Sequence, residues 1–169
     1  YLNESDLSGY LALGSNGEFM SLSEKEQLQV LEIFAREKGS KTVMVGTARE
    51  STKETIEFSQ KVAQMGFEFV SILTPHYFAK RMDGPTLFAY YEKIADNVPV
   101  PVLIYNAPGF AGGVHIPPDT VAKLAEHPNI VGMKDSSPVG PAPFLSALPE
   151  SDNFAVLAGS INFFYTSLH

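Results

Sequence analysis

Six short apolar runs divide the sequence, and each is long enough for a buried strand. The runs are continuous rather than alternating, as expected when both faces of a sheet are covered. They span Gly9 to Leu13, Thr42 to Val45, Phe69 to Leu73, Val100 to Tyr105, Ile130 to Lys134 and Phe154 to Ala158. We therefore predict six strands in a sheet whose two faces are both covered.

Helix signals fill the segments between these runs. Two helices open with a capping-box pattern, and a proline in the first turn opens two more. The predicted starts lie at Ser23, Ser51, Gly84 and Pro117. We expect Gly66 to stop the second helix and the fourth helix to end near His127. The prolines after Lys134 leave room for about two helical turns before the last strand.

Strands and helices alternate with a spacing of roughly thirty residues, the length of a βαβ unit. This alternation predicts a parallel α/β architecture, either a (β/α)8 TIM barrel or a doubly wound open sheet. Six strands are too few to close an eight-stranded barrel, so a barrel requires further strands. We find no linker that would separate two domains, and residues 1–169 are expected to form one unit.

Composition narrows the possible partners. The net charge of −7 argues against nucleic acid, and no apolar run approaches the roughly 20 residues of a membrane span. The sequence has no cysteine, which fits a reducing compartment such as the cytoplasm. It begins at Tyr1 without a methionine, so we expect a piece of a longer protein. A leader sequence that directs the protein to an organelle remains an alternative, because the missing N-terminal part would contain it.

Polar residues follow the strands directly. Because the carboxyl ends of parallel strands meet at one edge, both candidate architectures gather these residues at one mouth. The segments are Gly14 to Glu18, Gly46-Thr47, Thr74 to Tyr77, Tyr105-Asn106, Lys134-Asp135 and Gly159-Ser160. We therefore predict a binding or catalytic site at this mouth.

Lys134 is the most informative of these residues. It ends the buried run that starts at Ile130, where burial disfavours the ammonium form of an amine. A neutral lysine can attack a ketone and form a Schiff base. The ordinary alternative is a lysine whose stem is buried and whose ammonium group reaches water.

The other mouth segments allow two interpretations each. The turn at Ser15 and Asn16 is either a plain turn or a backbone nest that holds a carboxylate. Tyr105 could pack in the core with a satisfied hydroxyl, and Tyr77 could be a surface aromatic residue. The four histidines show no metal-ligand spacing, so we predict no metal site.

Taken together, the segments match one family in order and spacing. Gly14-Ser-Asn-Gly-Glu18, Thr74-Pro-His-Tyr77, Tyr105-Asn-Ala-Pro108 and Gly132-Met-Lys-Asp135 resemble motifs of the dihydrodipicolinate synthase and N-acetylneuraminate lyase family of pyruvate-dependent class I aldolases. The resemblance implies a (β/α)8 barrel with a C-terminal helical extension. It also implies that this chain holds strands two to seven and lacks the first strand, the eighth strand and the extension.

The same resemblance implies roles for individual residues. Lys134 looks like the Schiff-base lysine, and Tyr105 resembles the tyrosine that shuttles protons. Ser15 and Asn16 resemble the pair that holds the pyruvyl carboxylate, with Ser15 linking Tyr105 to Tyr77. The Tyr77 equivalent often reaches a neighbouring subunit, which implies a dimer or tetramer. Gly159 matches the family's glycine that lies close to the imine. The resemblance also implies a structural role for Glu18, which would hold its turn in place.

One position departs from the synthase pattern. Dihydrodipicolinate synthases carry an arginine after the Tyr-Asn-x-Pro motif that binds the distal carboxylate of the aldehyde, and Phe110 stands there in this chain. A phenyl ring cannot replace the bidentate guanidinium. The motifs look closer to the 4-hydroxy-2-oxoglutarate aldolase branch, and a 2-keto-3-deoxy sugar acid is a further possible substrate.

We therefore expect a carbon–carbon lyase that acts on pyruvate and an aldehyde without a metal or organic cofactor. The alternative enzyme is a synthase that condenses pyruvate with aspartate semialdehyde. A keto-acid sensor on the same fold would be a non-enzyme, but it would need neither Lys134 nor Tyr105. A doubly wound binding domain would need no amine at the fifth strand end.

Overall fold

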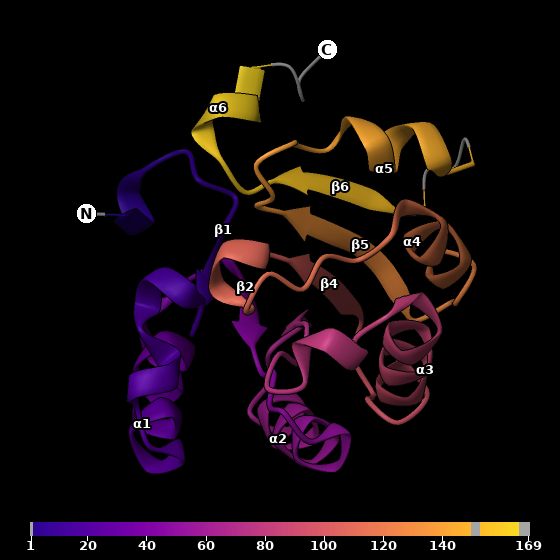
Figure 1. The fold of residues 1–169 in the computed structure, drawn as a ribbon. Helices are drawn as coiled ribbons and strands as arrows, with labels where there is room; N and C mark the ends of the chain where they lie inside the picture. The colour runs from indigo at the N-terminus through magenta and orange to yellow at the C-terminus, as the bar shows by residue number, and fades with distance from the viewer. Residues whose placement is uncertain (1, 150–152, 166–169) are drawn as a thin grey trace.

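The fold is a single parallel sheet with helices along its outer side (Figure 1). A computed structural model describes residues 2–149 and 153–165. The strands pair in the sequential order β1 to β6, and every neighbouring pair is parallel. Their bounds are β1 Gly9–Ala12, β2 Thr42–Gly46, β3 Phe69–Leu73, β4 Val102–Asn106, β5 Ile130–Asp135 and β6 Ala155–Ala158. The six predicted strands are therefore confirmed.

The helices follow the predicted starts. Their bounds are α1 Glu24–Glu37, α2 Thr52–Gln64, α3 Gly84–Ala95, α4 Pro118–Leu124, α5 Ala142–Ala147 and α6 Ile161–Phe164. Ser23 forms the full capping box with Glu26, and Gly66 follows α2 with a φ of 86°. Helix α4 ends at Leu124, and a hydrogen-bonded turn continues to His127. Single 3₁₀ turns occur in several of the loops.

Sequential strand order excludes the doubly wound alternative, in which the order reverses and helices cover both faces. Figure 1 shows helices α1 to α5 outside the arc of the strands. Many of the side chains that point toward these helices are fully buried, among them Val43, Val45, Val70, Ile72 and Ile104. The opposite face forms the concave side of the arc.

The concave face is apolar at the amino ends of the strands. Met44, Phe69, Leu103 and Ala155 line a hollow of about 720 Å³ there. Strands β1 and β6 are the two edges of the sheet, and Leu157 on β6 is 37% exposed. An open edge and an open apolar face both indicate a barrel wall rather than a closed barrel.

Candidate active site

The two central residues of the predicted site lie side by side at the carboxyl ends of β4 and β5. Tyr105 pairs with Lys134 in the strand register, so both side chains point to the same face of the sheet. The Nζ atom of Lys134 lies 4.6 Å from the centre of the Tyr105 ring. Lys134 is half-buried and is the second-to-last residue of β5, at the mouth.

Tyr105 connects Lys134 to the loop after β1. Its side chain is buried, and its hydroxyl lies 3.5 Å from the Oγ atom of Ser15. Either hydroxyl can donate this hydrogen bond, as a proton relay requires. The structure thus brings together Lys134, Tyr105 and Ser15, three of the four residues predicted to be catalytic.

An unusual backbone conformation shapes the loop that carries Ser15. Leu13 and Glu18 flank it with φ values of 53° and 54°, in the left-handed region that non-glycine residues seldom adopt. The backbone N–H of Glu18 donates to the carbonyl of Ser15, whereas the Glu18 side chain is exposed. Backbone hydrogen bonding therefore holds this turn in place, and Asn16 next to Ser15 is exposed.

Gly159 lies against the Lys134 side chain after β6. A Cβ atom added at Gly159 would sit 3.1 Å from the Cε atom of Lys134 and would also collide with Ser136. Any larger residue would therefore crowd the end of the lysine. The predicted position of Gly159 beside the amine is consistent with this geometry.

Tyr77 and Phe110 lie outside the Lys134 cluster. The Tyr77 ring is 78% exposed and packs edge-on against Phe78 with 4.9 Å between ring centres. Within the described residues no hydrogen bond joins the Tyr77 side chain to Ser15 or Tyr105. Phe110 ends the 3₁₀ turn Pro108–Phe110 and is 56% exposed.

A buried polar brace behind the mouth was missed by the sequence analysis. Gln27 of α1 donates to the carbonyls of Phe19 and Leu22 at 2.8 and 3.1 Å, and it accepts from Arg49 at 2.6 Å. Burial lowers the pKa of Arg49, whose guanidinium also lies 4.0 Å above the Phe58 ring. A glutamine four residues before the buried Leu31 was the available signal.

Glu50 extends this brace to the segment that carries Tyr77. Its carboxylate accepts from the backbone N–H groups of His76 and Tyr77 at 2.9 to 3.1 Å, and His76 Nδ1 lies 2.9 Å away. The loops after β1, β2 and β3 are thus linked through Gln27, Arg49 and Glu50. Fixed loops of this kind can hold catalytic side chains in one geometry.

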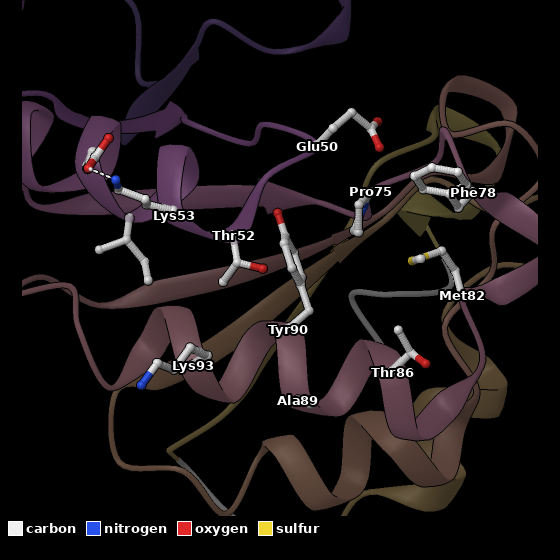
Figure 2. A pocket seen from close by; sticks show the side chains of 12 residues that line it. Glu50, Thr52, Lys53, Pro75, Phe78, Met82, Thr86, Ala89, Tyr90 and Lys93 are labelled. Carbon is white, nitrogen blue, oxygen red and sulfur yellow. Dashed lines mark ion pairs between the residues drawn. The ribbon is translucent and has the colours of Figure 1, made fainter.

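A groove of about 700 Å³ lies away from this mouth, on the outer wall between α2, α3 and the segment after β3 (Figure 2). Its wall includes Pro75, Phe78 and Tyr90, and Lys53 forms an ion pair with Glu57 beside it. Burial raises the pKa of Tyr90 above its ordinary value, so this phenol stays protonated. The groove contains neither Lys134 nor Tyr105, and we assign it no part in the chemistry.

Metal binding and membrane insertion can both be checked against the described residues. No group of three or more His, Asp or Glu side chains within residues 2–149 and 153–165 is arranged to hold a metal ion. In the same part of the chain, no helix combines the length and apolar character needed to cross a membrane.

Comparisons with known proteins agree with this geometry. The sequence model that describes the dihydrodipicolinate synthetase family matches residues 1–164 of this chain. A 4-hydroxy-tetrahydrodipicolinate synthase from Methanospirillum hungatei is 36% identical over 164 residues, which cover 96% of this chain and 55% of that protein. A "probable 4-hydroxy-2-oxoglutarate aldolase, mitochondrial" from Emericella nidulans is 34% identical over 139 residues, 79% of this chain and 45% of that protein.

A solved structure shows the same architecture. The 2-keto 3-deoxygluconate aldolase from Picrophilus torridus superimposes with a TM-score of 0.85 and 31% identity, over 96% of this chain and 58% of that one. The chain thus spans about half the length of the curated relatives that it matches. Its six parallel strands form part of a TIM barrel, as predicted. Sequence motifs, fold and comparisons agree, and the chain belongs to the dihydrodipicolinate synthetase family.

Proposed function

We propose that the protein makes or cleaves a carbon–carbon bond next to pyruvate through an imine on Lys134. The observation that carries this proposal is the line of three side chains at the mouth. Lys134 Nζ lies against the Tyr105 ring, and the Tyr105 hydroxyl lies 3.5 Å from Ser15. An amine beside a positioned acid–base group is the arrangement that Schiff-base chemistry needs.

Each step of the reaction uses a group in this line. The neutral Lys134 amine attacks the ketone carbon of pyruvate, the Tyr105 hydroxyl gives its proton to the leaving oxygen, and the loss of water leaves a protonated imine and a Tyr105 phenolate. The Tyr105 phenolate then takes a proton from the methyl carbon, and the electron pair of that C–H bond forms an enamine. In synthesis the enamine carbon attacks the aldehyde, and Tyr105 returns a proton to the new alkoxide. Cleavage runs through the same steps in reverse, without a metal or organic cofactor.

The remaining mouth residues bind the keto acid in this proposal. Ser15 and Asn16 hold the pyruvyl carboxylate at the turn after β1, because hydroxyl and backbone N–H donors suit an anion. Gly159 leaves the space beside Lys134 that an imine occupies. A keto-acid sensor would need the carboxylate turn alone, so the contact of Lys134 with Tyr105 favours an enzyme.

For the substrate we propose 4-hydroxy-2-oxoglutarate or a 2-keto-3-deoxy sugar acid. The exposed Phe110 offers no charge to a distal carboxylate. Aldolases among the relatives support this choice. The alternative is condensation of pyruvate with aspartate semialdehyde, which is favoured by the synthase from Methanospirillum hungatei at 36% identity. Faster turnover with the semialdehyde than with either aldol substrate would establish the alternative.

We further propose a homo-oligomer, a dimer or tetramer, in which Tyr77 reaches a neighbouring site. Its exposed ring beside the exposed Phe78 supports this role. The six strands would correspond to strands two to seven of the barrel, with the other strands and the helical extension outside residues 1–169. Cytoplasmic localisation, with an organelle as the other possibility, stays a prediction.

Borohydride trapping tests the central step. The intact gene product is treated with pyruvate and borohydride, and its peptides are analysed by mass spectrometry. We expect a reduced three-carbon adduct on Lys134, and none in Lys134→Ala. The control variant is Lys93→Ala, which removes an exposed lysine of α3 and should leave the adduct unchanged. An adduct on a different lysine would show that the proposed mechanism is wrong.

A further inference from the structure

Two fully buried polar side chains lie directly behind the reacting pair. Asn106 and Asp135 follow Tyr105 and Lys134 in sequence, and they are 0% and 1% exposed. The Asn106 Nδ2 atom donates to Asp135 Oδ1 at 2.7 Å. Asp135 also accepts from the backbone N–H of Ser137 at 3.2 Å and from the Ser137 hydroxyl at 2.9 Å.

This network joins three parts of the mouth. Asn106 and Asp135 are paired in the register of β4 and β5, so their hydrogen bond locks the ends of both strands together. The Oδ1 atom of Asn106 accepts from the backbone N–H of Ile116 at 3.1 Å. It thereby holds the far end of the loop that contains Phe110. The backbone adds two links, from Ser136 to Asn106 and from Gly159 to Asp135.

The acidic side chain in this network, Asp135, has no cationic partner among the described residues. Within residues 2–149 and 153–165 no ion pair involves Asp135. Its oxygens receive three donors, which suits a carboxylate because a carboxylate only accepts. Burying a carboxylate is costly unless hydrogen-bond donors are held in place around it. Each of these bonds therefore favours one arrangement of the strand ends.

We propose that Asn106 and Asp135 are positioning residues that hold Tyr105 and Lys134 in their reacting geometry. This inference rests on the proposed imine chemistry of Lys134. Adjacent residues of a strand point to opposite faces, so the pair acts from the helix side of the sheet while the reacting pair faces the mouth. A displacement of about 1 Å at the reacting atoms can cost about 100-fold in rate.

A second, half-buried amide next to the same strands separates positioning from simple stabilisation. Asn129, just before β5, donates through Nδ2 to the carbonyls of Ala95, Val98 and Val100 at 2.9 to 3.3 Å. Like Asn106 it makes more than one side-chain hydrogen bond, but at the amino end of the strands. A variant at Asn129 therefore loses comparable hydrogen bonds without touching the mouth.

The test measures how fast the intact gene product forms the borohydride-trapped pyruvate adduct on Lys134. Asn106→Asp faces one carboxylate with another, and Asp135→Leu removes the acceptor of three hydrogen bonds. We expect each to slow trapping by about 10- to 100-fold. The double variant Asn106→Asp/Asp135→Asn reverses the pair, with the acceptor at position 106 and the amide donor at position 135, and should recover at least about tenfold of the loss seen in Asn106→Asp. Asn129→Ala should lower the thermal midpoint and leave the trapping rate unchanged.

Ser137→Ala provides a milder probe should the charge variants fail to fold. It removes only the 2.9 Å bond to Asp135 and should slow trapping by about three- to tenfold. Trapping within twofold of wild type in the folded variants would overturn the positioning role alone. Equal slowing in Asn129→Ala would overturn it too, because the effect would then be general destabilisation. Absence of any adduct in the wild type would instead overturn the proposed function together with this inference.

Discussion

The two ends of the same six strands differ sharply in chemistry. At the amino ends the concave face is lined by side chains such as Met44, Phe69 and Leu103, around an apolar hollow of about 720 Å³. At the carboxyl ends the same face carries Tyr105 and Lys134, backed by a buried network of hydrogen bonds. Only a few residues of each strand separate the two regions.

This difference shows where the molecule can tolerate change. Apolar packing is non-directional, and similar volumes can replace one another there at modest cost. A reacting amine and its acid–base partner depend instead on distances and on hydrogen-bond direction. We therefore expect substitutions at the carboxyl ends to change rate and substitutions at the amino ends to change stability.

Lys134→Ala should have the largest effect at the carboxyl end. The variant cannot form an imine, so we expect turnover in the intact gene product to fall by about 10⁴-fold or more. Steady-state assays with 4-hydroxy-2-oxoglutarate would measure this, and thermal unfolding should stay close to wild type. Turnover at the wild-type level would exclude Lys134 as the nucleophile.

Tyr105→Phe should have the second largest effect. It removes the hydroxyl 3.5 Å from Ser15 but keeps the ring beneath Lys134. We expect turnover to fall by about 10²- to 10⁴-fold, the usual contribution of a positioned acid–base group, while some trapped adduct remains. The matched control is Tyr91→Phe, because that fully buried tyrosine donates to the carbonyl of Ile72 outside the mouth. A loss of turnover in Tyr91→Phe of the same size would point to general destabilisation.

Phe110→Arg should change substrate preference rather than overall rate. An arginine on the exposed turn after β4 supplies a bidentate partner for a distal carboxylate. We expect kcat/KM for aldehydes with such a group to rise by about tenfold relative to aldehydes without it. Phe110→Leu provides the control, since it removes the ring without adding charge. The same shift in both variants would show that loss of the ring, and not the new charge, is responsible.

Most of the fold could be predicted from the sequence because apolar runs and helix caps are local signals. The starts of β3 and β5 match their runs, and β4 begins at Val102 because Pro101 before it has no N–H to donate. The prediction that polar residues gather at one mouth also followed from local signals. It needs only that the strands are parallel, which the spacing of the runs indicates.

The hydrogen-bond partners within the site could not be predicted in the same way. The bond between Asn106 and Asp135 depends on the register of β4 and β5, which shifts between Val102 and Leu103. Register is a tertiary property that is set by packing and not by either strand alone. For the same reason the role of Gln27 could not be predicted, because its hydrogen bonds to Arg49 and to the loop carbonyls depend on tertiary packing.

The smallest effect on turnover is expected at the amino ends. Leu103 points to the same face as Tyr105 but lies two residues nearer the amino end of β4. Leu103→Ala should destabilise the protein by about 2–4 kcal/mol, because it leaves a void in an apolar face, and should change kcat by less than threefold. Thermal unfolding and steady-state kinetics on the same preparation would measure both. A drop in kcat comparable to that of Tyr105→Phe would show that the apolar end controls the geometry of the mouth, and the two regions would then have to be treated as one.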